Sequence, residues 1–168
     1  MTGDEDIWLD EEQQRDWRAS IVGMTYLLGV VSRDLEIATG LSMPEYEILV
    51  RLSEAPDWSV RMSDLADQVA HSRSRVTHTV TRLEAAGLVE RRPTVEDKRG
   101  IAATMTRDGF DRLQAAAPFH VRSVRARLVD VVPREQLAQV GDAMRAVLLA
   151  AGLDETLLGP HPSEGLRD

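Results

Sequence analysis

The chain has 168 residues, of which 43% are hydrophobic, 29% charged and 4% aromatic, and its formal net charge is −8. This composition is typical of a globular protein with an aliphatic core, not of a disordered or membrane-spanning chain. The absence of cysteine excludes disulfides, thiolate metal sites, cysteine nucleophiles and cysteine-based oxidation sensors. The acidic N-terminus lacks the features of a signal peptide, so we expect a soluble, cytoplasmic protein with no membrane partner.

The charge is distributed unevenly along the chain. Residues 1–60 contain 4 basic and 13 acidic side chains, whereas residues 61–107 contain 9 basic and 6 acidic ones. A basic middle between acidic flanks indicates a local anion-binding surface. A chance cluster of solvated side chains would give the same distribution, so charge alone leaves both interpretations open.

The first part of the chain predicts two helices. Apolar residues at three- and four-residue steps predict a long helix over residues 9–38, which Gly40 ends. The stretch "LSMPEYEILVRL" predicts a second helix. Ser42 and Glu45 have capping-box spacing there, and Pro44 falls in the first turn, where its missing N–H is tolerated.

Two shorter helices follow. The stretch "SDLADQVA" predicts a third helix with Ser63 as its N-cap and with Leu65 and Val69 facing inward. The stretch "SRSRVTHTVTRLEAAG" predicts a fourth helix over residues 72–86, ended by Gly87. Its expected inner face consists of Val76, Val80, Leu83 and Ala86.

The remaining chain predicts a hairpin and two more helices. The stretches "LVERR" and "IAATMT" predict two strands joined by a charged loop, which form a wing over residues 89–106. Thr106 is the expected cap of a fifth helix over residues 107–130, which Pro118 should bend or divide. Pro133 opens a sixth helix that Gly152 ends.

This order predicts a mainly α fold with a small β-hairpin wing, a winged helix-turn-helix. We assign residues 41–106 to the DNA-binding domain, and residues 9–40 and 107–152 to dimerisation helices. We expect residues 1–8 to form an acidic, flexible N-terminus and residues 153–168 to form a flexible tail. The terminal helices have more apolar surface than one small domain can cover, which predicts a homodimer. A monomer whose terminal helices fold back is the alternative.

The fourth helix is the candidate recognition helix on double-stranded DNA. In a helix-turn-helix, the N-terminal part of the second helix meets base edges in the major groove. Arginine suits guanine, and serine can reach several base edges or a phosphate. The candidate base contacts are therefore Ser72, Arg73, Ser74, Arg75 and His78, and the candidate phosphate contacts are Thr77, Thr81, Arg82 and Lys98.

The wing has its own candidate contact. Arg99, near the tip, could enter a minor groove, whose narrow A·T tracts attract guanidinium groups. Asp97 is the expected partner that orients Arg99. Any single arginine could instead have a structural role without contacting DNA. Arg82 and Arg92, for example, could form salt bridges with Glu84 or Glu90 on a solvated face.

The stretch "VTHTVTRLEAAGLVERRPTVEDKRGIAATMT" resembles the core of the MarR family of transcriptional regulators. The resemblance depends most on "RLEAAGLVERR", on Asp97 and Arg99, and on the closing "MT". It implies a triangular dimer that binds a pseudo-palindromic operator as a repressor, commonly released by a small phenolic or other anionic ligand. It places Arg73, Ser74, Thr77 and His78 at groove contacts and Arg99 at the wing tip. Arg73 and Arg75 replace residues that are usually smaller or uncharged in the family, which implies an unusual operator.

Other functions are less well supported. The sequence has no glycine-flanked nucleophile turn and no glycine-rich phosphate loop, and its four histidines lack metal or triad spacing, so we expect neither an enzyme nor a resident cofactor. A metal-responsive regulator is one alternative, in which His71 would form a site between domains with His120 or with Asp and Glu residues of the first two helices. A DNA-binding or interaction module without effector response is another.

The sequence also suggests where an effector would bind. A pocket should lie where the long first helix, the second helix and the wing domain meet. Trp17, Met24, Tyr46 and Arg51 could line it. A stripe of Trp and Met at helical spacing is, however, more often part of a core.

Overall fold

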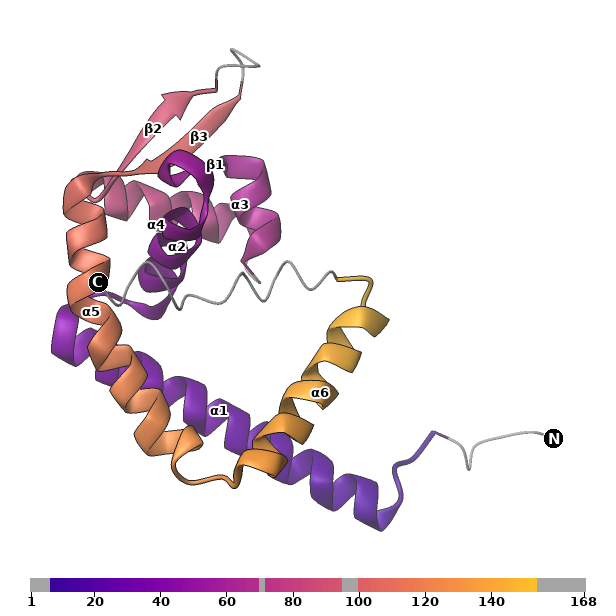
Figure 1. Ribbon diagram of the computed structural model, residues 1–168. Helices are drawn as coiled ribbons and strands as arrows, with labels where there is room; N and C mark the ends of the chain where they lie inside the picture. Colours follow the sequence, from indigo (N-terminus) through magenta and orange to yellow (C-terminus); the bar gives the residue numbers. More distant parts are fainter. Residues whose placement is uncertain (1–6, 70–71, 95–99, 154–168) are drawn as a thin grey trace.

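The computed structural model describes residues 7–69, 72–94 and 100–153 (Figure 1). The predicted order of helices and strands is confirmed, with an additional strand and two short helical turns. The elements are α1 (Glu11–Thr39), α2 (Met43–Glu54), a 3-10 turn (Pro56–Trp58), β1 (Ser59–Arg61), α3 (Met62–Gln68), α4 (Arg73–Ala85), β2 (Val89–Pro93), β3 (Ile101–Met105), α5 (Arg107–Val124), a π-helical turn (Arg125–Val129) and α6 (Arg134–Ala150). The described residues contain no helix that is long and apolar enough to cross a membrane.

Most of the predicted helix ends are confirmed. The backbone N–H of Ser42 donates to Glu45 Oε2 at 2.9 Å, as expected of a capping box. Gly40 and Gly87 both have φ of +73°, the left-handed conformation that a helix-ending glycine supplies. Thr106 Oγ1 accepts from the Gly109 N–H at 3.0 Å and so caps α5.

Two predicted helix positions are wrong. Ser63 is not the N-cap of α3, because the helix already begins at Met62 and Arg61 occupies the cap. Ala86 does not extend the inner face of α4, because it is the C-cap residue and its side chain is exposed. In both cases an adjacent turn or strand moves the end of the helix by one or two residues.

The sheet has three antiparallel strands in the order β1–β3–β2. The hairpin of β2 and β3 is the predicted wing, with Val89 opposite Met105 and Pro93 opposite Ile101. Strand β1, which the sequence pattern did not predict, pairs with β3 through Ser59 and Thr104, and the two hydroxyls lie 2.9 Å apart. This strand ties the turn before α3 to the wing.

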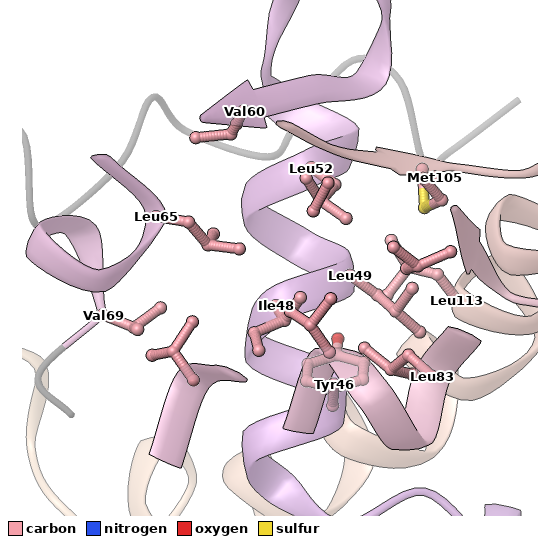
Figure 2. Close-up of a cluster of buried hydrophobic side chains, with 14 of the residues drawn as sticks. Tyr46, Ile48, Leu49, Leu52, Val60, Leu65, Val69, Leu83, Met105 and Leu113 are labelled. Atoms are coloured by element: carbon pink, nitrogen blue, oxygen red, sulfur yellow. The ribbon is translucent and has the colours of Figure 1, made fainter. Parts of the chain in front are cut away.

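The core surrounds α2, and Figure 2 shows its side chains extending to both sides of that helix. On one side lie Leu65 and Val69, and on the other Leu83 and Leu113 (Figure 2). The residues at the centre are at most 1% exposed, namely Ile48, Leu49, Leu52, Leu65, Leu83 and Leu113. Truncating one such leucine to alanine costs about 2–5 kcal/mol, so this core fixes how α4 and the wing sit on α2.

The remaining helices form a second part of the molecule. Figure 1 shows α1 and α5 side by side and α6 extending away from α5. Asp34 of α1 accepts a hydrogen bond from Ser123 Oγ of α5 at 2.8 Å, and the Arg127 guanidinium lies 3.4 Å away. Pro118 lies inside α5, which continues through it. None of the residues of α6 is buried within this chain.

Candidate nucleic-acid interface and adjacent cavity

One face of α4 is fixed in the core and the other is exposed. Val76, Val80 and Leu83 are at most 1% exposed. The opposite face contains the predicted DNA contacts at its N-terminal half, and all are exposed: Ser72, Arg73, Ser74, Arg75, Thr77 and His78. A helix anchored in this way presents a rigid row of side chains, which is the geometry that major-groove recognition requires.

The two arginines at the start of α4 differ in their surroundings. Arg73 lies 3.9 Å from Asp67, and both side chains are largely exposed, so this ion pair is weak. Arg75 forms no ion pair with any residue that the structure describes. The Arg75 guanidinium is therefore available to an external acceptor without the loss of an internal one. Ser72 caps the helix, because its hydroxyl accepts from the Arg75 backbone N–H at 3.4 Å.

The three phosphate contacts predicted on α4 already have partners within the protein. Thr77 Oγ1 donates to the Arg73 carbonyl, and Thr81 Oγ1 donates to the Thr77 carbonyl, both at 2.9 Å. Arg82 Nε lies 3.1 Å from Oε1 of Glu45, the buried capping-box residue of α2. A phosphate contact from Thr77 or Thr81 would require its hydroxyl to exchange an internal hydrogen bond, whereas Arg82 has further N–H donors besides the Nε that faces Glu45. The role of all three residues on DNA stays a prediction.

Arg91 on β2 connects the wing to the recognition helix, a role that was not predicted from the sequence. Its guanidinium forms an ion pair with Glu84 and donates to the Thr77 carbonyl at 3.0 Å and to Thr81 Oγ1 at 2.9 Å. By contrast, Arg92 pairs with Glu90 at 2.7 Å on the exposed strand surface, the ordinary role considered for it above. The contacts of Arg91 join different elements of the fold, and the spacing of residues along the sequence does not reveal such contacts.

The tip of the wing is outside the described residues, and with it Asp97, Lys98 and Arg99. Their predicted contacts with phosphate and with a minor groove therefore stay predictions. At the base of the wing the Thr94 N–H donates to the Gly100 carbonyl at 2.9 Å, so the two strands are still paired where the loop leaves them.

A cavity of about 810 Å³ lies where α1, α2, α5 and α6 approach the end of α3. Small-molecule sites in proteins have volumes of about 300–1,000 Å³. Tyr46 and Arg51 line the cavity, as predicted, but Trp17 and Met24 are not among its lining residues. The wall from α1 instead consists of Leu27, Leu28 and Val31, which lie farther along the helix, and Trp17 is 55% exposed.

The polar groups of the cavity lie on α2 and α5. Arg51 and Glu54 form a partly buried ion pair at 3.4 Å. Burial raises the pKa of the Glu54 carboxyl, and the Arg51 charge opposes this shift. His120 of α5 packs against the Tyr46 ring with a centroid distance of 4.8 Å, and its buried Nδ1 has no hydrogen-bond partner among the described residues. Burial lowers the pKa of His120, so its imidazole is neutral at pH 7.

The metal-site alternative can be compared with the described part of the chain. No group of three or more His, Cys, Asp or Glu side chains there is arranged to hold a metal ion. His71, one of the two histidines proposed for such a site, is outside the described residues.

A helix-turn-helix with an exposed second helix, followed by a β-hairpin braced against it, defines a winged helix-turn-helix protein. Comparison with known proteins identifies the family. A model of the MarR family matches residues 41–101. The structure of Sco3205, a MarR family transcriptional regulator from Streptomyces coelicolor in complex with DNA, is 38% identical, covers 96% of each chain and superimposes with a TM-score of 0.81. This chain therefore belongs to the MarR family of transcriptional regulators, as the sequence resemblance predicted.

Other relatives agree with this assignment. AbsC, another MarR family regulator from Streptomyces coelicolor, is 37% identical over 86% of this chain and 97% of its own, with a TM-score of 0.81. The HTH-type transcriptional repressor YetL from Bacillus subtilis is 32% identical over 87 residues. That match spans 52% of YetL, so the chain covers about half the length of this curated relative. These relatives are transcriptional regulators and not enzymes, which agrees with the expectation from the sequence.

Proposed function

We propose that this chain is a homodimeric, sequence-specific DNA-binding repressor that recognises a pseudo-palindromic operator. The observation that carries the proposal is the exposed N-terminal half of α4. Arg73, Arg75 and His78 project there from a helix whose other face is buried in the core. Arg73 and Arg75 would contact base edges, and the positive end of the helix dipole would attract nearby phosphates. The DNA complex of Sco3205 and the repressor description of YetL support this proposal.

The dimer would form through α1, α5 and α6, in residues 9–40 and 107–152. Large apolar side chains are exposed on all three helices, including Val22 at 68%, Phe119 at 43% and Val147 at 61%. Soluble monomers rarely leave many large apolar side chains exposed together, so we infer that a partner covers these residues. A second copy is the occupant that fits, because a two-fold dimer would also place two α4 helices on one face for two operator half-sites.

Effector response would come from the cavity. Its walls combine helices assigned to dimerisation with α2 of the DNA-binding domain, residues 41–106. A ligand that fits only one arrangement of these helices would change the separation of the two α4 helices, and with it the operator affinity. The site of action would be the cytoplasm, where such a regulator meets DNA.

The proposal is tested by a fluorescence-anisotropy titration of the purified full chain with the DNA upstream of its own gene. Arg75→Ala is the test variant, and Arg15→Ala, an exposed arginine on α1, is the matched control. We expect saturable, competitor-resistant binding at two chains per site, weakened by Arg75→Ala by about 1–3 kcal/mol, the range for a bidentate base contact. The proposal would be contradicted if both proteins had the same affinity for the specific DNA, and if neither protein bound the specific DNA more tightly than random DNA.

A further inference from the structure

The charged side chains that line the cavity between α1, α2 and α5 do not fit the anionic ligand that the family resemblance implies. The cavity walls are mainly aliphatic, with Leu27, Val31, Val50 and Val124 among the lining residues. Among the residues that the structure describes, its charged lining side chains are Arg51, Glu47, Glu54 and Asp67, three carboxylates and one guanidinium. An anionic ligand would therefore meet three carboxylates and one guanidinium among the described lining residues.

The neutral polar groups favour the same kind of ligand. His120 lines the cavity and is neutral, so one of its ring nitrogens can accept a hydrogen bond. The Tyr46 hydroxyl can also accept, and its ring face attracts a cation. Among the described lining residues, every polar side chain except that of Arg51 can accept a hydrogen bond.

We propose that this cavity binds an amphiphilic organic cation, a protonated amine attached to an apolar or aromatic body. The ammonium group would lie among Glu47, Glu54 and His120, and the apolar body would lie against the aliphatic wall formed by α1 and α5. This departs from the anionic ligand that the family resemblance implied. The inference rests on the proposed function of the cavity as the effector site and names the ligand class of that site.

The complementarity has a physical basis in desolvation. A carboxylate brought into a partly buried site loses hydration, and a nearby like charge increases the cost. A ligand cation instead compensates carboxylates that are already desolvated in the protein, such as Glu54. Because the interaction occurs out of bulk water, the difference between a cation and an anion with the same body should exceed about tenfold in Kd.

The test uses three fluorescent probes with one dansyl body: dansylcadaverine (cationic), dansyl butylamide (neutral) and dansyl-6-aminocaproate (anionic). Probe fluorescence is followed during titration with the full chain, because the dansyl group brightens and shifts to the blue when it leaves water. We expect the cation to bind at least about tenfold more tightly than the anion, with the neutral probe between them.

Two variants show whether the preference arises in the cavity. Glu47→Gln/Glu54→Gln removes two lining carboxylates and should reduce the cation preference to within about threefold. Glu36→Gln/Glu90→Gln removes two exposed carboxylates that do not line the cavity and should leave the preference unchanged. Glu47→Gln alone, which keeps the Arg51–Glu54 ion pair intact, should give a partial loss if the double variant fails to fold.

Operator binding, measured in parallel, separates this inference from the proposed function. Tighter binding of the anionic probe, or binding of none of the three, would overturn the inference even if operator binding is intact. Failure of operator binding with a cation preference retained would overturn the repressor proposal and leave the ligand class standing.

Discussion

The Arg91 brace between the wing and the recognition helix predicts a measurable stability effect. Arg91→Met keeps the apolar stem of the side chain and removes the guanidinium. The variant loses the ion pair with Glu84 and the hydrogen bonds to the Thr77 carbonyl and to Thr81 Oγ1. A net hydrogen bond contributes about 0.5–1.5 kcal/mol, and a surface ion pair about 0–1 kcal/mol. The Glu84 side chain is 40% exposed, so screening reduces the ion-pair contribution.

We therefore expect Arg91→Met to lower the free energy of unfolding by about 1–2 kcal/mol. For a chain of this size that corresponds to a decrease in Tm of about 2–8 °C. The measurement is thermal unfolding followed by circular dichroism, at one protein concentration because a dimer's Tm depends on concentration. Arg92→Met is the matched control. It removes only the exposed pair with Glu90 and should change the stability by less than about 0.5 kcal/mol.

Operator DNA gives a second measurement on the same variant. Without the brace, the wing and α4 no longer keep one relative position, so Arg91→Met should lose specific affinity but keep non-specific affinity. A double-mutant cycle with Glu84→Gln should give a coupling energy above about 0.5 kcal/mol. The reasoning is refuted if Arg91→Met and Arg92→Met unfold at the same temperature and the cycle shows no coupling.

Three further changes test other parts of the structure. Val147→Glu places a charge on the exposed apolar face of α6, so analytical ultracentrifugation should show a shift from dimer to monomer; an unchanged dimer would place the interface elsewhere. Gly109→Ala should destabilise the fold by about 1–3 kcal/mol in urea, because the added Cβ would collide with the Leu88 carbonyl oxygen; wild-type stability would mean that α5 can move away from Leu88. Asp34→Asn tests the link between α1 and α5. The hydrogen bond from Ser123 lowers the pKa of Asp34 from its ordinary value of 3.8, so its carboxylate stabilises the folded state above that pH, and this contribution disappears as the pH falls through the lowered value. The stability difference between wild type and Asp34→Asn should therefore shrink below about pH 4, and a constant difference down to pH 2 would contradict this assignment.

Local chemistry explains why much of the fold could be predicted from the sequence. Ser42 with Glu45, Thr106, Gly40 and Gly87 each fix a helix end through contacts within a few residues. The inner face of α4 follows from the spacing of its apolar residues. By contrast, β1 has only three residues and exists because it pairs with β3 more than 40 residues away, as Ser59 does with Thr104.

The same distinction applies to the candidate site. The exposed arginines of α4 could be found because the helix period separates them from the core face. The partners of Arg82 and Arg91 could not, because they depend on how α2 and the wing pack against α4. The cavity wall was misplaced along α1, since periodicity gives the apolar face of a helix but not which part of that face meets α2.

The most direct test of the central claim is a binding selection from randomised double-stranded DNA, carried out with wild type and Arg75→Ala. The account predicts that wild type enriches a two-fold symmetric motif with half-site centres about one helical turn, roughly 10 base pairs, apart or a multiple of it. Arg75→Ala should relax the preference at one symmetric pair of positions. No enriched motif, or an asymmetric motif identical for both proteins, would contradict a dimer that recognises sequence through α4.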